Sequence, residues 1–97
     1  MIRVMIERQC QLGKEKQLRG LLLELRSAGM RQHGYITGET LREADNPSLF
    51  MVISTWMTLE AWKAWQTARP RLLREEMMDS LLTAERKVRV FIEDVEI

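Results

Sequence analysis

Apolar and polar residues alternate along residues 2–9, where Ile2, Val4 and Ile6 fall on one side of an extended chain. A period of two residues is typical of a β-strand with one buried face. From residue 14 to about residue 31 the apolar residues recur at helical spacing instead, which predicts an amphipathic helix. The residues of this apolar stripe are Leu18, Leu21, Leu22, Leu25, Ala28 and Gly29.

Three further strands are predicted, over residues 35–43, 50–56 and 87–95. The segment Phe50–Trp56 is apolar on both sides, as in a strand buried on both faces. Residues 45–48, Asp-Asn-Pro-Ser, have the composition of a turn, so the second and third strands are expected to form a hairpin.

The segment after Trp56 predicts a second helix, with Thr58 as its N-cap and Leu59 near its start. Pro70 lacks a backbone donor and crowds the preceding turn, so we expect a kink or a break near residues 68–69. Beyond it, helical spacing predicts buried apolar residues and exposed acidic ones. The expected buried residues are Leu73, Met77 and Leu81, and the expected exposed ones are Glu75, Glu76 and Asp79.

The predicted order β-α-β-β-α-β indicates one α+β domain over residues 1–97, with a ferredoxin-like, four-stranded antiparallel sheet. In that sheet the first and third strands are central. Cross-strand charge and apolar matching favours one register between the first and last strands. Its predicted pairs are Arg3 with Glu93, Met5 with Phe91, Glu7 with Arg89, Val4 with Ile92 and Ile6 with Val90.

The third strand carries apolar residues on both faces, whereas the two predicted helices cover only one face of the sheet. An open apolar face of that size favours a homodimer in which two sheets pack together as a dimeric α+β barrel. A monomer is the alternative, if charged residues keep the face wetted. Those residues are Arg3, Glu7, Glu39, Arg89 and Glu93.

Composition narrows the functional classes. Fifteen basic and fourteen acidic residues leave a net charge of +1, which argues against a nucleic-acid partner. No apolar run is long enough to cross a membrane, and charged residues within the first apolar stretch are unlike a signal peptide. The single cysteine, Cys10, is expected to be a buried residue at a strand end, in a protein of the reducing cytoplasm.

All three tryptophans, Trp56, Trp62 and Trp65, lie within ten residues. Large aromatic side chains anchor helices to sheets, so a core role is the first interpretation. Their functional interpretation is an apolar wall for a flat ligand, and we select Trp56 and Trp65 for it.

Polar candidates are fewer. His33 and Tyr35 are the candidate proton-handling residues, and Glu39 is a candidate pocket carboxylate. Each also has an ordinary interpretation, as a helix-end, strand or solvated residue respectively. The arginines at 69, 71 and 74 form a basic helix edge, for which a solvated face is the first interpretation and attraction of an anionic ligand is the alternative. No metal-ligand spacing or phosphate-binding glycine loop is visible in the sequence, so we expect neither metal nor other cofactor.

Four segments carry a family resemblance: Gly34–Thr40, Asn46-Pro47, Val52–Trp56 and Leu59–Trp65. Together they resemble the antibiotic biosynthesis monooxygenase domain over nearly the whole chain, and Ser-Thr-Trp followed by spaced tryptophans is the most specific part. The resemblance implies a dimeric α+β barrel, in agreement with the periodicity. Activities in the family range from metal-free and flavin-free oxidation of aromatic polyketides to haem degradation and action on quinols.

The haem-degrading branch requires an asparagine on the first strand and a histidine along the second helix. This chain has Ile6 and Glu7 on that strand and residues 73–75, Leu-Arg-Glu, on that helix, which argues against haem degradation. Trp56 and Trp65 match family tryptophans. The resemblance therefore implies a cofactor-independent monooxygenase of a small aromatic or quinol-like compound, with a non-catalytic ligand-binding or structural dimer as the alternative.

Overall fold

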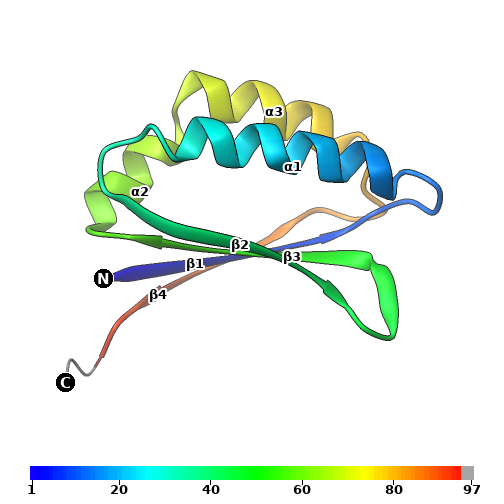
Figure 1. Ribbon diagram of the computed structural model, residues 1–97, viewed down its shortest axis with the longest axis horizontal. Coiled ribbons are helices and arrows are strands. Elements are labelled where there is room, and N and C mark those ends of the chain that lie inside the picture. The colour runs from blue at the N-terminus through cyan, green and yellow to red at the C-terminus, as the bar shows by residue number, and fades with distance from the viewer. Residues whose placement is uncertain (95–97) are drawn as a thin grey trace.

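The computed structural model describes residues 1–94, which form one antiparallel sheet and three helices (Figure 1). In chain order the elements are β1 (Ile2–Gln9), α1 (Glu15–Gly29), β2 (Tyr35–Glu43), β3 (Asn46–Trp56), α2 (Leu59–Gln66), α3 (Arg69–Asp79) and β4 (Lys87–Ile92). The strand order is β2-β3-β1-β4. This confirms the ferredoxin-like α+β fold with the first and third strands at the centre. The last strand, predicted to reach about Val95, ends at Ile92; Glu93 and Asp94 are not part of it, and Val95 lies outside the described residues.

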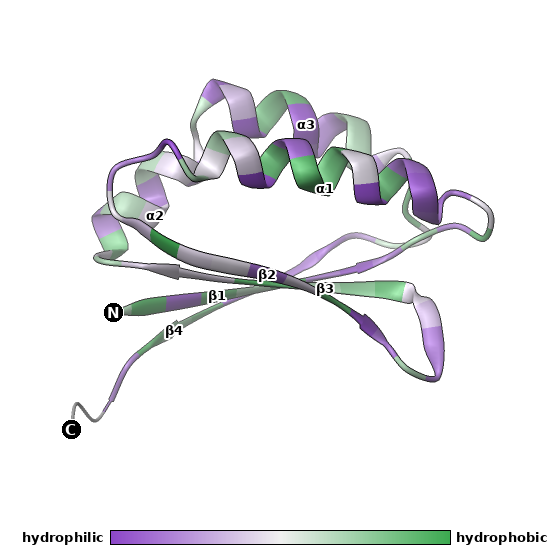
Figure 2. Ribbon diagram, viewed as in Figure 1, coloured by the Kyte–Doolittle hydropathy of each residue, from purple (hydrophilic) through white to green (hydrophobic). Residues whose placement is uncertain are grey.

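All three helices lie on one face of the sheet, and the other face is open (Figure 1). Apolar and polar residues follow one another along α1, as expected of a helix with one buried side (Figure 2). The core forms where this side meets alternate residues of the central strands. Its members include Val4, Ile6, Leu18, Leu22, Phe50, Trp56, Trp62, Trp65 and Met78.

The predicted interruption near Pro70 is a complete break between α2 and α3. Helix α2 begins after Thr58, whose hydroxyl accepts a hydrogen bond from the Ala61 backbone N–H at 3.1 Å, as expected of an N-cap. Ala68 is extended, with φ −67° and ψ 136°, and α3 starts anew beside it. Pro70 lies in the first turn of α3, where a backbone N–H has no partner within the helix.

The break changes which face of α3 is buried, so one sequence prediction is wrong. Leu73 and Met77 are 52% and 56% exposed, while Glu75 is only 3% exposed. Arg71, predicted to be solvated, is also buried. The predicted apolar stripe continued the buried side of α2 beyond the break. Because α3 is a separate helix, a different side of it faces the sheet.

The register between β1 and β4 differs from the predicted one by two residues. Arg3 lies opposite Phe91, Met5 opposite Arg89 and Glu7 opposite Lys87. Because a shift of two residues keeps every side chain on its face, alternation cannot distinguish the two registers. Lys87 Nζ lies 3.8 Å from Glu7 Oε2, so an opposite-charge pair forms in the observed register as well.

The hairpin between β2 and β3 is tighter than the turn predicted over residues 45–48. Residues 44 and 45 alone form the turn, and Asn46 already pairs with Glu43. A register shift beside Arg42 places Pro47 at an irregularity of the edge hairpin, where its missing donor is tolerated. The Arg42 Nε–H donates to the Pro47 carbonyl oxygen at 2.7 Å and closes this end.

Candidate functional site

A cavity of about 50 Å³ lies between the helix-covered face of the sheet and the three helices. Its floor comes from β1, β2 and β3, and its roof from α1, α2 and the first turn of α3. One end is aromatic, with Tyr35, Trp56, Trp62 and Trp65, and the other end is basic. The two ends therefore differ in the chemistry that they present to a bound molecule.

The aromatic end is built around Trp56, the last residue of β3. The ring centroid of Trp56 lies 6.3 Å from that of Trp65 with 28° between the planes, and 6.1 Å from that of Trp62 at 59°. The Tyr35 ring meets Trp56 edge-on, with centroids 5.4 Å apart and planes at 87°. These are favourable aromatic geometries, and they hold the wall in one arrangement. The Trp56 indole N–H also donates to Ser54 Oγ at 3.1 Å.

Tyr35 brings a phenol hydroxyl to this wall. It stands at the start of β2, where the pairing with β3 shifts register between Tyr35 and Thr37. The irregularity of the edge strand thus lies beside Tyr35, and Gly38 pairs regularly with Ser54. Gly38 matters for a different reason: a Cβ at this position would lie 2.5 Å from the Tyr35 hydroxyl oxygen. The absence of a side chain at Gly38 gives the phenol its place in the cavity lining.

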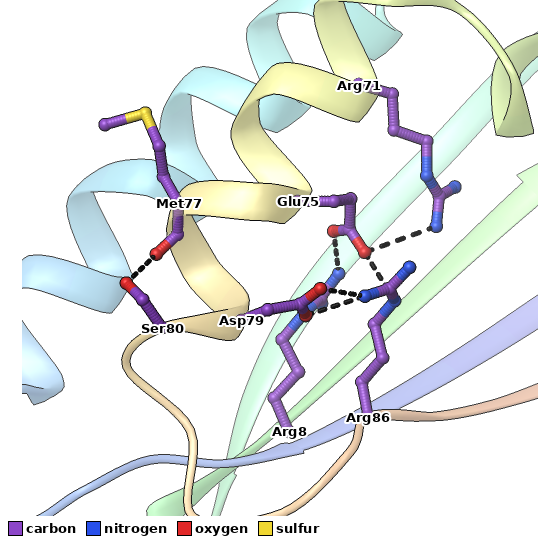
Figure 3. Close-up of polar contacts among 7 residues, drawn as sticks. All are labelled: Arg8, Arg71, Glu75, Met77, Asp79, Ser80 and Arg86. Atoms are coloured by element: carbon purple, nitrogen blue, oxygen red, sulfur yellow. Dashed lines mark hydrogen bonds and ion pairs between the residues drawn. The ribbon is translucent and has the colours of Figure 1, made fainter.

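The basic end contains two buried guanidinium groups, those of Arg8 on β1 and Arg71 on α3. Both contact Glu75 (Figure 3): Arg8 Nη2 donates to Glu75 Oε1, and Arg71 Nη2 lies 3.7 Å from Glu75 Oε2. Arg86 Nε lies 2.6 Å from the same Oε2, and Arg86 Nη1 donates to both Asp79 carboxylate oxygens at 2.6 Å.

Burial weakens the protonated form of both arginines. Burial lowers the pKa of Arg71 to about 10, against the opposing attraction of Glu75. It lowers the pKa of Arg8 as well, although Glu75 accepts its hydrogen bond. A pKa of about 10 still leaves Arg71 charged at neutral pH. The cavity therefore has a permanently cationic end with little solvent around it.

The predicted site residues divide between the cavity and the surface. Trp56, Trp65 and Tyr35 line the cavity together, and Trp62, interpreted first as a core residue, lines it as well. His33 is exposed in the connection between α1 and β2 and is not part of the lining.

Glu39 borders the cavity but pairs with Ile53, between the lining residues Val52 and Ser54. Its exposed side chain therefore projects to the opposite face of the sheet, and its backbone forms the border. Cys10 is buried, and desolvation raises its pKa, as expected of a structural thiol.

Sequence reasoning missed Arg8 and the burial of Arg71 and Glu75. A signal for Arg8 was present, because it continues the alternation of Ile2, Val4 and Ile6 and so points into the core. Its partner could not be found in the same way, since Glu75 is 67 residues away and belongs to a helix whose phase depends on the break at Ala68.

Two kinds of feature are absent from the described residues. Within residues 1–94, no helix combines the length and apolar character needed to cross a membrane. The same residues contain no group of three or more His, Cys, Asp or Glu side chains placed to hold a metal ion.

The sheet order, the single helical layer and the internal aromatic cavity define a ferredoxin-like α+β domain with a pocket between its layers. The chain belongs to the antibiotic biosynthesis monooxygenase family, whose model matches residues 1–71. This confirms the resemblance seen in the sequence. Among curated proteins, none matches the chain.

Solved structures support the fold across the whole domain. A conserved protein of Methanosarcina mazei superposes with a TM-score of 0.92 at 16% identity, covering 96% of this chain and 92% of that one. SnoaB of Streptomyces nogalater, a cofactor-independent oxygenase, superposes with a TM-score of 0.84 at 17% identity, covering 99% and 96%. A protein of Mycobacterium tuberculosis gives 0.89 at 17% identity, covering 98% and 96%. At these identities the likeness is one of fold.

Proposed function

We propose that this protein is a cofactor-independent monooxygenase that oxidises a small aromatic or quinol-like compound in the cavity between sheet and helices. The observation that carries the proposal is the aromatic end of the cavity, where three tryptophans and a phenol hydroxyl surround one space. Membership of the monooxygenase family and the fold shared with SnoaB, named as a cofactor-independent oxygenase, support it.

The proposed reaction needs no external reductant. An electron-rich phenol or quinol reacts with dioxygen at a hydrogen-bearing ring carbon opposite or next to a hydroxyl, where a new C–O bond forms. The O–O bond then breaks, one oxygen atom stays on the ring as a quinone carbonyl, and the other leaves as water. Both hydrogen atoms of that water come from the substrate, which is the species oxidised, while dioxygen is reduced.

In this scheme Trp56 and Trp65 hold the flat ring by stacking, and Tyr35 is the proton-handling group, since its ring lies in the cavity lining. His33, the second proton-handling candidate, would need to reach a substrate from outside the lining. Glu39 contributes its backbone to the border. Tyr35→Phe and His33→Gln therefore separate the two candidates: we expect the first to reduce turnover and the second to leave it unchanged.

We also propose that the protein works as a cytoplasmic homodimer joined through the open face of the sheet. That face carries a contiguous set of apolar side chains: Met5, Leu41, Leu49, Met51, Ile53 and Phe91. Leu41 and Phe91 are 46% and 39% exposed, and a contiguous exposed set of apolar side chains is typical of an interaction surface. The lone buried cysteine, Cys10, supports the reducing compartment.

Oxygen uptake tests the catalytic proposal. Purified protein is mixed with electron-rich phenols, naphthols and quinols, and dissolved oxygen and quinone formation are followed together. Equal consumption of oxygen and formation of quinone is the expected result. Trp56→Phe should lower turnover by a larger factor than it lowers the free energy of unfolding, because a smaller ring preserves most of the burial but alters the wall.

The alternative is a non-catalytic dimer that binds a small aromatic ligand. The position of His33 outside the lining favours it, because Tyr35 is then the single proposed proton-handling group. Thermal stabilisation by phenols without oxygen uptake would establish this alternative and contradict the monooxygenase.

A further inference from the structure

The basic end of the cavity plays no part in the reaction just described, yet it holds the most deeply buried charges of the domain. Arg8 is 1% exposed and Arg71 is 3% exposed, and both line the cavity. A buried ion carries a desolvation penalty of several kcal/mol unless opposite charge and hydrogen bonds offset it. The partners of these two groups therefore decide what the cavity can accept.

Within residues 1–94 the charges of the ion-pair cluster at this end of the cavity do not balance. Three guanidinium groups, those of Arg8, Arg71 and Arg86, share two carboxylates (Figure 3). Asp79 accepts both of its hydrogen bonds from Arg86. Glu75 is then divided between its contacts to all three arginines, and one positive charge remains uncompensated at the cavity end of the cluster.

Hydrogen-bond donors without acceptors lie at the same basic end of the cavity. Among the described residues, Arg8 Nε and Nη1 have no acceptor, although both atoms are buried. No hydrogen bond joins the Arg71 guanidinium to a described residue, and its nearest carboxylate oxygen, Glu75 Oε2, is 3.7 Å away. Buried guanidinium N–H groups without acceptors are rare, and an oxyanion provides both the acceptor atoms and the missing charge.

The cationic end also adjoins the aromatic wall. The Arg71 guanidinium lies over the Trp62 ring, 4.7 Å from its centroid, so the charge and the stacking surface meet at one residue. A molecule with a flat ring and a charged oxygen would place the two groups at opposite ends of this cavity.

We propose that the cavity binds its aromatic ligand as an oxyanion, with a carboxylate or a deprotonated phenol oxygen held by Arg8 and Arg71. This deepens the proposed function of the same pocket and rests on it for the reaction but not for binding. The present volume of about 50 Å³ holds a few water molecules, so a ring must displace lining side chains to enter, and Arg26 and Thr40 are exposed members of the lining.

The test uses the three indole N–H signals of ¹⁵N-labelled protein, since every tryptophan of the chain lines the cavity. Benzoate is titrated against its neutral counterpart benzamide, and 4-nitrophenolate against neutral 4-nitroaniline. The first pair tests a carboxylate and the second a phenolate. We expect the anion of at least one pair to shift the indole signals with a Kd at least about tenfold lower than its neutral counterpart, about 1.4 kcal/mol.

Variants assign the effect to the arginines. Arg71→Gln should raise the Kd of the anion about tenfold or more, while Glu75 keeps its contacts to Arg8 and Arg86. Arg69→Gln is the matched control, because it removes the same charge from an exposed position of the same helix turn. Arg8→Gln tests the second arginine in the same way, because Glu75 keeps its contacts to Arg71 and Arg86, and the Kd of the anion should again rise about tenfold.

The outcomes are distinct. Equal affinity for anion and neutral counterpart, equal effects of the variants at 69 and 71, or no binding of either pair would overturn the proposal and indicate that water alone satisfies the arginines. Preferential anion binding without oxygen uptake would retain the oxyanion site and contradict the monooxygenase. Turnover of phenols that does not depend on Arg71 would support the monooxygenase and contradict the oxyanion site.

Discussion

The Glu75 carboxylate on α3 accepts a hydrogen bond from Arg8 on β1, a residue 67 positions away in the chain. Both side chains are almost fully buried, and the contact ties the C-terminal helix to the central strand beneath it. Burying a charge in the core is unfavourable unless its partner is present, so each residue depends on the other.

Glu75→Gln should therefore destabilise the fold by about 3 kcal/mol, because it leaves the buried Arg8 charge without its carboxylate. Glu76→Gln changes an exposed neighbour in the same way and should stay within about 0.5 kcal/mol of the parent protein. Urea unfolding followed by tryptophan fluorescence measures both. Equal unfolding free energies for the two variants would show that the buried pair contributes nothing net.

Two glycines should respond in opposite directions to alanine. Gly34 has a φ of +85°, and a Cβ there would lie 2.5 Å from the Ala61 Cβ, so Gly34→Ala should destabilise by about 2–4 kcal/mol.

Gly20 is exposed within α1, where a Cβ meets no atom within 4 Å, so Gly20→Ala should stabilise by about 1 kcal/mol. Thermal unfolding checks both variants, and a lower melting temperature for Gly20→Ala would contradict the space seen around it.

The contact between Ser48 and Glu15 should give part of the stability a pH dependence. Ser48 Oγ donates to Glu15 Oε2 at 2.6 Å, and this hydrogen bond is the main reason that the pKa of Glu15 is lowered from its ordinary 4.5. A lowered carboxyl pKa stabilises the folded state above the unfolded-state pKa, and that stability is lost as the pH falls through the lower folded-state value.

Ser48→Ala should accordingly be less stable than the parent protein at neutral pH, and the difference should narrow as the pH falls below 4.5. Unfolding free energies measured across that range test this. Ser27→Ala, at an exposed position of α1, is the control and should show no such narrowing. A difference that stays constant down to low pH would mean that the hydrogen bond does not favour ionised Glu15.

The proposed dimer interface can be tested at Phe91, which is 39% exposed on the open face of the sheet. Phe91→Glu should dissociate the dimer, because it places charge in an apolar contact surface. Leu23→Glu introduces the same charge at an exposed position of α1, on the other side of the sheet, and should leave the assembly unchanged. Sedimentation at micromolar concentration measures both, and a parent protein that is monomeric there would contradict the proposed assembly.

Most of the fold follows from local patterns in the sequence. The two-residue period of β1, the apolar stripe of α1 and the turn composition before β3 identify the elements, and short antiparallel connections leave few sheet orders. The register of a strand pair and the buried side of a separate helix could not be predicted from such local patterns. The β1–β4 register was displaced by two residues because that shift preserves the faces, and the buried side of α3 was misassigned because a new helix starts at residue 69.

The candidate site was predictable in its apolar half alone. Trp56 and Trp65 have a recognisable spacing, and their place in the cavity lining agrees with it. The basic half depends on charged residues that hydropathy assigns to the surface. Glu75 is buried between Arg8 and Arg71 and offsets part of their charge, which is a property of the assembled layers rather than of any one segment.

The break at Ala68 has a consequence for how this pocket can change over time. In one continuous helix Trp62 and Arg71, nine residues apart, would face roughly opposite sides. Because the helix is interrupted at Ala68, Arg71 lies on the same side as Trp62. Substitutions or insertions around residues 67–68 could thus turn the cationic group relative to the aromatic wall while both helices and the sheet stay intact. Sequence changes at this break could therefore alter which ligand the cavity prefers while the fold stays the same.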